Sequence, residues 1–233
     1  MFQLKKMREG VYMLSFTQHI DLCYAFLRYQ EFYESTNPRF YGKTFTWAEY
    51  IRWYTLTNKK EGSNPHAFYY ASDWSGFNAP AEVIGKVHDL GIPDPNHYDE
   101  IMHGIYKLIM TECDKAYLIG AVPGTSTEKH ELTHALYYLN SEYKNKVVNT
   151  IQKTHNANRK CLDERAKLIE CMSDILFKMG YAASSIVDEI NAFTTTGDMK
   201  FFDKLNKQAY ASLKKELVTL HKKYYPEFVK DIK

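Results

Sequence analysis

Several features that would place this chain in a special class are absent from its sequence. Its four cysteines form no Cys-x-x-Cys pair and show no regular spacing, which argues against a disulfide framework and against a cysteine zinc site. The N-terminus has no apolar segment typical of a signal peptide, and no apolar run approaches the length of a membrane span. We therefore expect reduced thiols and a cytoplasmic protein without a transmembrane segment, with secretion by another kind of signal left open.

Charge excess and internal repetition are also missing. The net charge is only +2, and no nucleic-acid-binding motif is recognisable, so we expect no nucleic-acid partner. No repeat or low-complexity linker marks a domain boundary. The 233 residues, 45% of them hydrophobic, are enough for one substantial core.

Hydrophobic periodicity predicts a mostly helical chain with a few short strands. Strands are predicted as a hairpin at 2–4 and 11–16, and again at 67–71 and 116–121, with an irregular aromatic loop at 73–77. Helices are predicted to begin at Thr17, Thr46, Asn78, Asp94, Tyr143, Asn158, Ser185 and Phe201. The expected fold class is α+β, with many helices beside a small sheet of three or four strands.

The clearest functional signal is the run His130-Glu131-Leu132-Thr133-His134. Two histidines four residues apart on a helix point the same way, so both imidazoles can bind one zinc ion. At ~100° per residue, His134 lies about 40° from His130, whereas the apolar residues lie on the opposite side. A capping box of Thr125 and Glu128 after the strand at 116–121 favours a helix start here.

A catalytic zinc usually has a third protein ligand, and Glu189 is the best candidate. Ile186, Ile190 and Phe193 form the apolar face of its helix, and burying that face turns Glu189 inward and Asp188 outward. A buried carboxylate needs a cation, which zinc would supply. The remaining candidates for this position are Glu164, Glu170, Asp174 and His155.

These residues resemble the gluzincin-type zinc metallopeptidases, which combine HExxH on one helix with a Glu on a later helix. The resemblance covers 130–134 and the segment 188–193. It implies a zincin-like core, with His130, His134 and Glu189 as zinc ligands and Glu131 as general base. It also implies a residue that stabilises the transition state, for which His155, Tyr181 and His221 are open candidates. The metzincin and thermolysin spacings do not fit, because Tyr137 and Asn140 occupy the metzincin positions and 153–155 carry no carboxylate.

The predicted function is zinc-dependent hydrolysis of a peptide or protein substrate. Zinc lowers the pKa of its bound water and polarises the scissile carbonyl, and Glu131 takes the proton and passes it to the leaving amine. Asp174 or Asp188 would orient a ligand histidine, and the strand at 67–71 or 116–121 would offer an edge to an extended peptide. We expect one metallopeptidase domain over 1–233, with 1–110 as a candidate N-terminal lobe and 111–233 as the catalytic lobe.

The alternative function is a non-enzymatic or degenerate zincin that keeps a structural zinc and acts as a protein-binding module. Such a site would be closed by a fourth ligand, His155 or a cysteine. The aromatic loop at 73–77 is a second candidate binding surface. The intact Glu131 favours the enzyme, because a structural site has no need of a carboxylate there. The sequence does not predict the oligomeric state.

Overall fold

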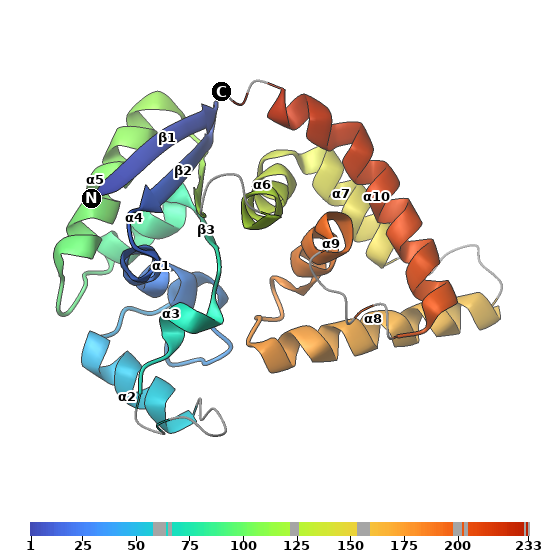
Figure 1. Ribbon diagram of the computed structural model, residues 1–233, viewed down its shortest axis with the longest axis horizontal. Helices are drawn as coiled ribbons and strands as arrows, with labels where there is room; N and C mark the ends of the chain where they lie inside the picture. Colours follow the sequence, from blue (N-terminus) through green and yellow to red (C-terminus); the bar gives the residue numbers. More distant parts are fainter. Residues whose placement is uncertain are drawn as a thin grey trace. The chain divides into compact units, whose positions relative to one another are not determined.

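The computed structural model describes residues 1–57, 64, 67–121, 126–152, 159–197, 202, 205–230 and 232, with the backbone alone for 159–163. The chain forms two compact units, Met1–Pro123 and Gly124–Lys233, and each is described by itself. The described part contains ten helices and one four-stranded mixed sheet, which confirms the predicted α+β class. The sheet belongs to the first unit and the helix with the HExxH motif belongs to the second (Figure 1).

The sheet has the strand order β1-β2-β4-β3. Strands β1 (Phe2–Arg8) and β2 (Val11–Phe16) form the predicted antiparallel hairpin, and Gly10 in its turn has a φ of 72°, a conformation that favours glycine. Strand β4 (Tyr117–Gly120) pairs in parallel with β2 and antiparallel with β3 (Phe77–Pro80). Because β4 lies between β2 and β3, the predicted strand at 116–121 exists but has no free edge for a peptide.

The predicted strand at 67–71 is wrong. Residues 67–69 are irregular and Tyr70–Asp73 is the short helix α3. Phe68 and Tyr70 pack in the aromatic core of this unit, where their rings stack at 5.9 Å, and this segment pairs with no strand of the sheet. The strand lies further on, at β3, where an aromatic loop and a helix start were predicted. There the side chain of Asn78 accepts a hydrogen bond of 2.6 Å from the hydroxyl of Tyr117 on β4, so it contributes to strand pairing and does not cap a helix.

Four longer helices complete the first unit: α1 (His19–Glu34), α2 (Trp47–Thr57), α4 (Ala81–Asp89) and α5 (His97–Glu112). Helix α1 packs against the sheet, and its core residues share one buried cluster with Leu14 and Leu118. The approach is close at Gly120, where a Cβ would lie 2.6 Å from the ring of Phe26. A larger residue at this point of β4 would have to push aside the side chains of Phe26 and Leu22 on α1.

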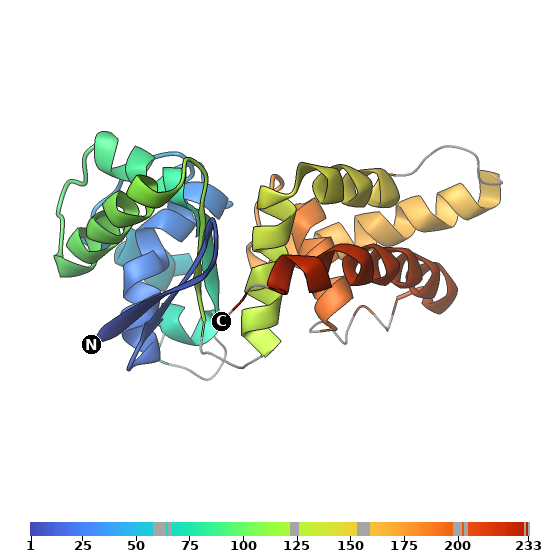
Figure 2. The ribbon, with the colours of Figure 1, turned by 90° about the horizontal axis from the view of Figure 1, so that it is seen from above.

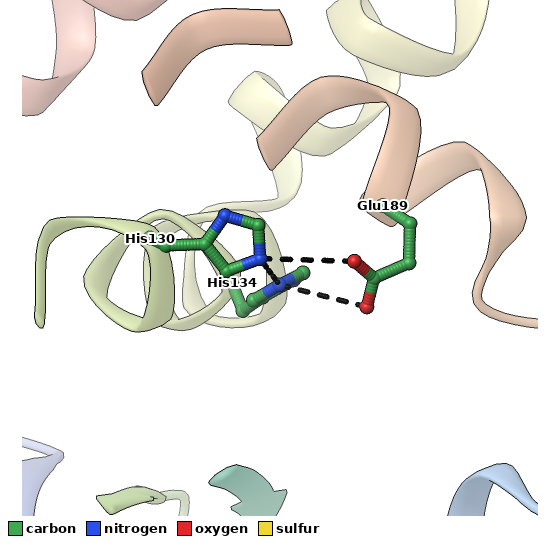
Figure 3. Close-up of side chains that lie close together, drawn as sticks. All are labelled: His130, His134 and Glu189. Atoms are coloured by element: carbon green, nitrogen blue, oxygen red, sulfur yellow. Dashed lines mark hydrogen bonds and ion pairs between the residues drawn. The ribbon is translucent and has the colours of Figure 1, made fainter. Parts of the chain in front are cut away.

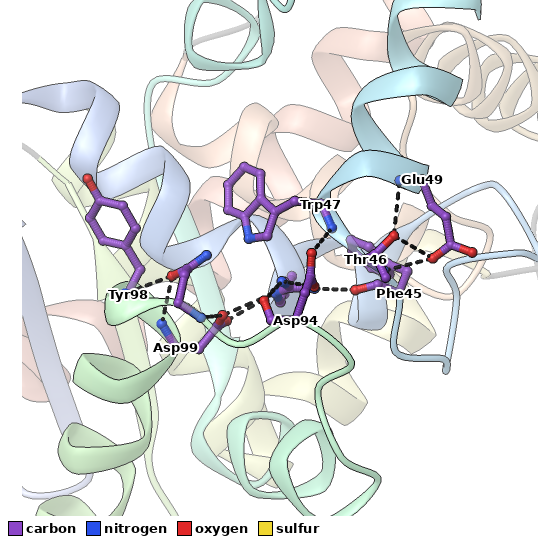
Figure 4. Close-up of polar contacts among 9 residues, drawn as sticks. Phe45, Thr46, Trp47, Glu49, Asp94, Tyr98 and Asp99 are labelled. Atoms are coloured by element: carbon purple, nitrogen blue, oxygen red, sulfur yellow. Dashed lines mark hydrogen bonds and ion pairs between the residues drawn. The ribbon is translucent and has the colours of Figure 1, made fainter.

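A buried arginine on α1 contacts Phe45, Asp94 and Asp99, three of the residues labelled in Figure 4. Arg28, which is 3% exposed, forms ion pairs with Asp94 at 2.6 Å and Asp99 at 3.1 Å and donates to the carbonyl of Phe45. Asp94 also accepts a hydrogen bond of 2.9 Å from the backbone N–H of Trp47. The buried guanidinium is therefore compensated by both charge and hydrogen bonds, as a buried charge must be.

The second unit is helical throughout its described part: α6 (Ser126–Leu139), α7 (Ser141–Ile151), α8 (Arg159–Met179), α9 (Ile186–Thr196) and α10 (Lys207–Val229). Helix α6 packs on α9, and α7 lies beside α10 (Figure 2). Helix α9 ends at Gly197, whose φ of 80° forms a left-handed cap. The predicted cap residue Thr125 lies outside the described residues.

The cysteines and the lengths of the helices bear on two of the predictions. Cys23, Cys113 and Cys171 are free thiols, as predicted, and the side chain of Cys161 lies outside the described part. None of the helices that the structure describes is both long and apolar enough to cross a bilayer.

Candidate metal centre

The motif helix α6 is buried on every side over the run His130–Tyr137. The helical wheel predicts one buried apolar face and one face that carries the ligands. The structure differs because α6 is enclosed by α7, α9 and α10 within its unit. His130 is 8% exposed and His134 only 2%, so the two imidazoles lie in an interior where electrostatic interactions are strong.

Three side chains from two helices converge at this point (Figure 3). The Nε2 atoms of His130 and His134 lie 3.1 Å apart. The carboxylate of Glu189 on α9 lies 3.7 Å from Nε2 of His130 and 3.6 Å from Nε2 of His134. In tetrahedral zinc sites, bonds of about 2.0–2.1 Å place adjacent ligand atoms about 3.3 Å apart. The observed separations therefore bracket the spacing that a metal ion needs.

The hydrogen bonds at the far nitrogens indicate which way the lone pairs of the two histidines point. The hydroxyl of Thr196 donates to the carbonyl of Ala192 at 2.8 Å, so its oxygen accepts from Nδ1 of His130 at 3.4 Å. Nδ1 of His134 lies 3.0 Å from the carboxylate of Asp188, which accepts a hydrogen bond from the N–H of that nitrogen. Both Nε2 lone pairs then face each other and Glu189, an arrangement that requires a cation or a proton between them.

The hydrogen bonding of Glu189 points in the same direction. It is 2% exposed, and its Oε2 atom accepts no hydrogen bond from any described residue. Leaving a buried carboxylate oxygen without a hydrogen bond is costly unless a cation compensates it. The group of His130, His134 and Glu189 could therefore hold a metal ion. Among the described residues, no other group of three or more His, Cys, Asp or Glu side chains converges in this way. A donor set of two imidazoles and one carboxylate suits zinc and other divalent first-row metals.

Asp188 lies against His134, whereas the helical wheel predicts that it points outward. This prediction is wrong because α9 is covered by four helices, which bury a wider arc than one apolar stripe. Burial raises the pKa of Asp188. Burial lowers the pKa of His134, but Asp188, Glu189 and Glu131 together raise the pKa of this imidazole well above its ordinary value. Asp174, the other candidate for orienting a histidine, is exposed on α8.

Glu131, the predicted general base, is 5% exposed on α6. Its negative charge is one of the groups that raise the pKa of His134, so it acts electrostatically on the ligand group. Its role in proton transfer stays a prediction.

The remaining candidate residues do not join the group. Glu164 and Glu170 are exposed on α8, and His155 lies outside the described residues. Tyr181 packs edge-on against the ring of Phe193 at 6.0 Å, and Phe193 in turn contacts the ring of His130 at 4.5 Å. Tyr181 is therefore one ring removed from the ligands.

His221 on α10 supports the motif helix from its other side. Thr133 donates its hydroxyl proton to the carbonyl of Lys129 at 2.9 Å, so its oxygen accepts from Nε2 of His221 at 3.2 Å. The His221 ring also stacks on Tyr225 at 4.4 Å. Burial, helped by the charge of Lys129, lowers the pKa of His221 from 6.5 to about 4.

This shift predicts that the second unit loses stability in mild acid. Because the pKa is lower in the folded state, the contribution of neutral His221 is complete above about pH 6.5 and is lost as the pH falls towards 4. We expect the free energy of unfolding to fall by roughly 2–3 kcal/mol more in the wild type than in His221→Gln between these pH values. Urea titrations of both proteins, followed by circular dichroism at several pH values, measure the difference. If the unfolding free energies of the two proteins fell equally with pH, His221 would not be the group responsible.

Sequence reasoning named Asp188 as a candidate for orienting a ligand histidine, and this residue contacts His134, but it missed the other residues around the ligands. Thr196 lies seven residues after Glu189, and Phe193 lies four after it, so all three share one face of α9. The spacing of seven residues between Glu189 and Thr196 could have predicted that Thr196 lies beside the ligands. No comparable signal marks Asn191, whose side chain accepts a hydrogen bond of 2.8 Å from the hydroxyl of Tyr143 on α7.

Comparison with known proteins yields no relative. No protein-family model matches the chain, and no curated protein and no solved structure matches it either. The resemblance to gluzincins therefore rests on the group of His130, His134 and Glu189, and it assigns no family.

Proposed function

We propose that this protein is a zinc-dependent hydrolase of the HExxH metallopeptidase type, with a zincin-like core, that cleaves a peptide or protein substrate. His130, His134 and Glu189 would hold the zinc ion. The observation that carries this proposal is the convergence of two Nε2 lone pairs on a buried carboxylate whose Oε2 atom lacks a hydrogen bond. It stays a prediction that the two units work as one metallopeptidase domain over 1–233, with a catalytic lobe at 111–233. The cytoplasmic location also stays a prediction.

Each polar side chain of the site has a distinct task in this proposal. When bound, zinc would supply a Lewis acid and a water molecule whose pKa is shifted towards neutrality. Asp188 and Thr196 hold the Nδ1 protons of His134 and His130, which keeps the Nε2 lone pairs available for ligation. Glu131 would accept the proton of the attacking water and deliver it to the leaving amine.

The metal site is tested by comparing the metal content of the wild type with that of Glu189→Ala. We expect the purified wild type to bind about one equivalent of zinc and the variant to bind it at least ~100-fold more weakly, because only two imidazoles remain. Inductively coupled plasma mass spectrometry after dialysis against zinc gives the stoichiometry. Asp174→Ala is the matched control, since it removes an exposed carboxylate from α8. Equal zinc content in all three proteins would contradict the assignment of Glu189.

A structural zinc without catalysis is the alternative, and the burial of the site favours it. His134 and Glu189 are each 2% exposed, as in closed structural sites, whereas a catalytic site keeps one position open to water. X-ray absorption spectroscopy of the zinc-loaded protein separates the two functions. Three protein ligands and one water support the hydrolase, and four protein ligands support the structural site.

A further inference from the structure

Helix α9 carries an unusual set of buried polar atoms. Four of its side chains have an atom that no described residue hydrogen-bonds: Oδ1 of Asp188, Oε2 of Glu189, Nδ2 of Asn191 and Oγ1 of Thr194. The atom on Glu189 belongs to the ligand group. The atoms on Asp188 and Asn191 are of opposite kind, because a carboxylate oxygen accepts hydrogen bonds and an amide nitrogen donates them.

The two residues are placed to satisfy each other. Asp188 and Asn191 are three residues apart on one helix, so their side chains are neighbours on the same face. The other atom of each side chain is already engaged. Oδ2 of Asp188 contacts Nδ1 of His134, and Oδ1 of Asn191 accepts the hydroxyl proton of Tyr143. The engaged atoms hold both groups in orientation, which leaves one donor and one acceptor on the same face of α9 without a direct hydrogen bond between them.

We propose that Asn191 is a positioning residue that fixes the carboxylate of Asp188 against His134 through one bridging water. Tyr143, Asn191, Asp188 and His134 then form a polar chain from α7 through α9 to α6. The inference deepens the proposed metal site and rests on it, since the task of the chain is to hold Nε2 of His134 in the direction of the metal. Tyr143 and Asn191 are fully buried, so bulk solvent does not compete for these contacts.

The first test needs no metal. In the metal-free, ¹⁵N-labelled full chain, the Nδ1 proton of His134 is expected to exchange slowly with water, because it is buried and held by Asp188. Asn191→Leu, which removes the amide at similar volume, should speed this exchange at least ~10-fold. Tyr143→Phe keeps Asn191 but removes the hydroxyl that donates a hydrogen bond to its side chain, so it should have a smaller effect in the same direction. Thr194→Val is the matched control, because it removes another unpartnered polar atom from the same helix without a route to His134.

The second test measures zinc affinity by competition with a chromophoric chelator. Asn191→Leu should weaken zinc binding by ~10–100-fold in the wild-type background and by less than ~2-fold in Asp188→Asn, because Asn191 acts through Asp188. An equal loss in both backgrounds would show a general packing effect and overturn the proposal.

The two readouts separate this inference from the proposed function. Unchanged proton exchange in both Asn191→Leu and Tyr143→Phe overturns the positioning role, whatever the metal content. Exchange that depends on Asn191 in a protein that binds no zinc supports the polar chain and refutes the metal site.

Discussion

Replacing Glu131 with Gln is expected to lower the turnover of a peptide substrate by about 10²–10⁴-fold, while zinc remains bound. The amide has nearly the same shape as the carboxylate but cannot accept a proton at neutral pH. None of the atoms that converge at the metal group belongs to Glu131, so ligation should persist. Turnover of the zinc-loaded full chain on a library of quenched fluorescent peptides gives the activity, and metal analysis of the same samples gives the occupancy.

The matched control for this experiment is Glu128→Gln, which makes the same chemical change one turn earlier on α6. It should retain both zinc and activity. Full turnover by Glu131→Gln would exclude Glu131 as the base, and loss of zinc from this variant would show that the carboxylate stabilises the metal group.

Replacing Arg28 with Met is expected to destabilise the first unit by about 3–5 kcal/mol. The change leaves the aliphatic part of the side chain but removes the charge that Asp94 and Asp99 share. Asp99 is 3% exposed, and its carboxylate would remain buried without its cation. Urea unfolding followed by tryptophan fluorescence isolates this effect, because all three tryptophans, at positions 47, 53 and 74, lie in the first unit.

Two further variants separate the buried charge from general damage. Arg52→Met removes an exposed arginine on α2 and should change the unfolding free energy by less than about 0.5 kcal/mol. Adding Asp99→Asn to Arg28→Met should restore part of the loss, because it removes the stranded charge. A loss below about 1 kcal/mol in Arg28→Met would mean that water or another cation replaces the guanidinium.

The parts of the fold and site that follow from local sequence were predictable. The hairpin, the helix at 126–139 and the inward orientation of Glu189 on its own helix depend on patterns within a few residues. Strand β3 was not predictable in this way, because its partner β4 lies about forty residues further on. The strand is only four residues long and is buried on both faces, so it gives no long alternating pattern.

Asp188 shows the same limit at the site. A helical wheel assigns it to solvent because the wheel contains only residues of its own helix. Its contact with His134 depends on how α6 packs on α9, which is tertiary information. The role of Asn191 depends on a third helix, α7, and was therefore further out of reach of the sequence.

The position of the ligands along the chain has a mechanical consequence. A cation bound by His134 and Glu189 would close a loop that contains all of α7 and α8, much as a disulfide bond does but reversibly. The supply of metal would then govern how long the helical unit withstands digestion, so that chelation shortens the lifetime of the protein as well as stopping its chemistry.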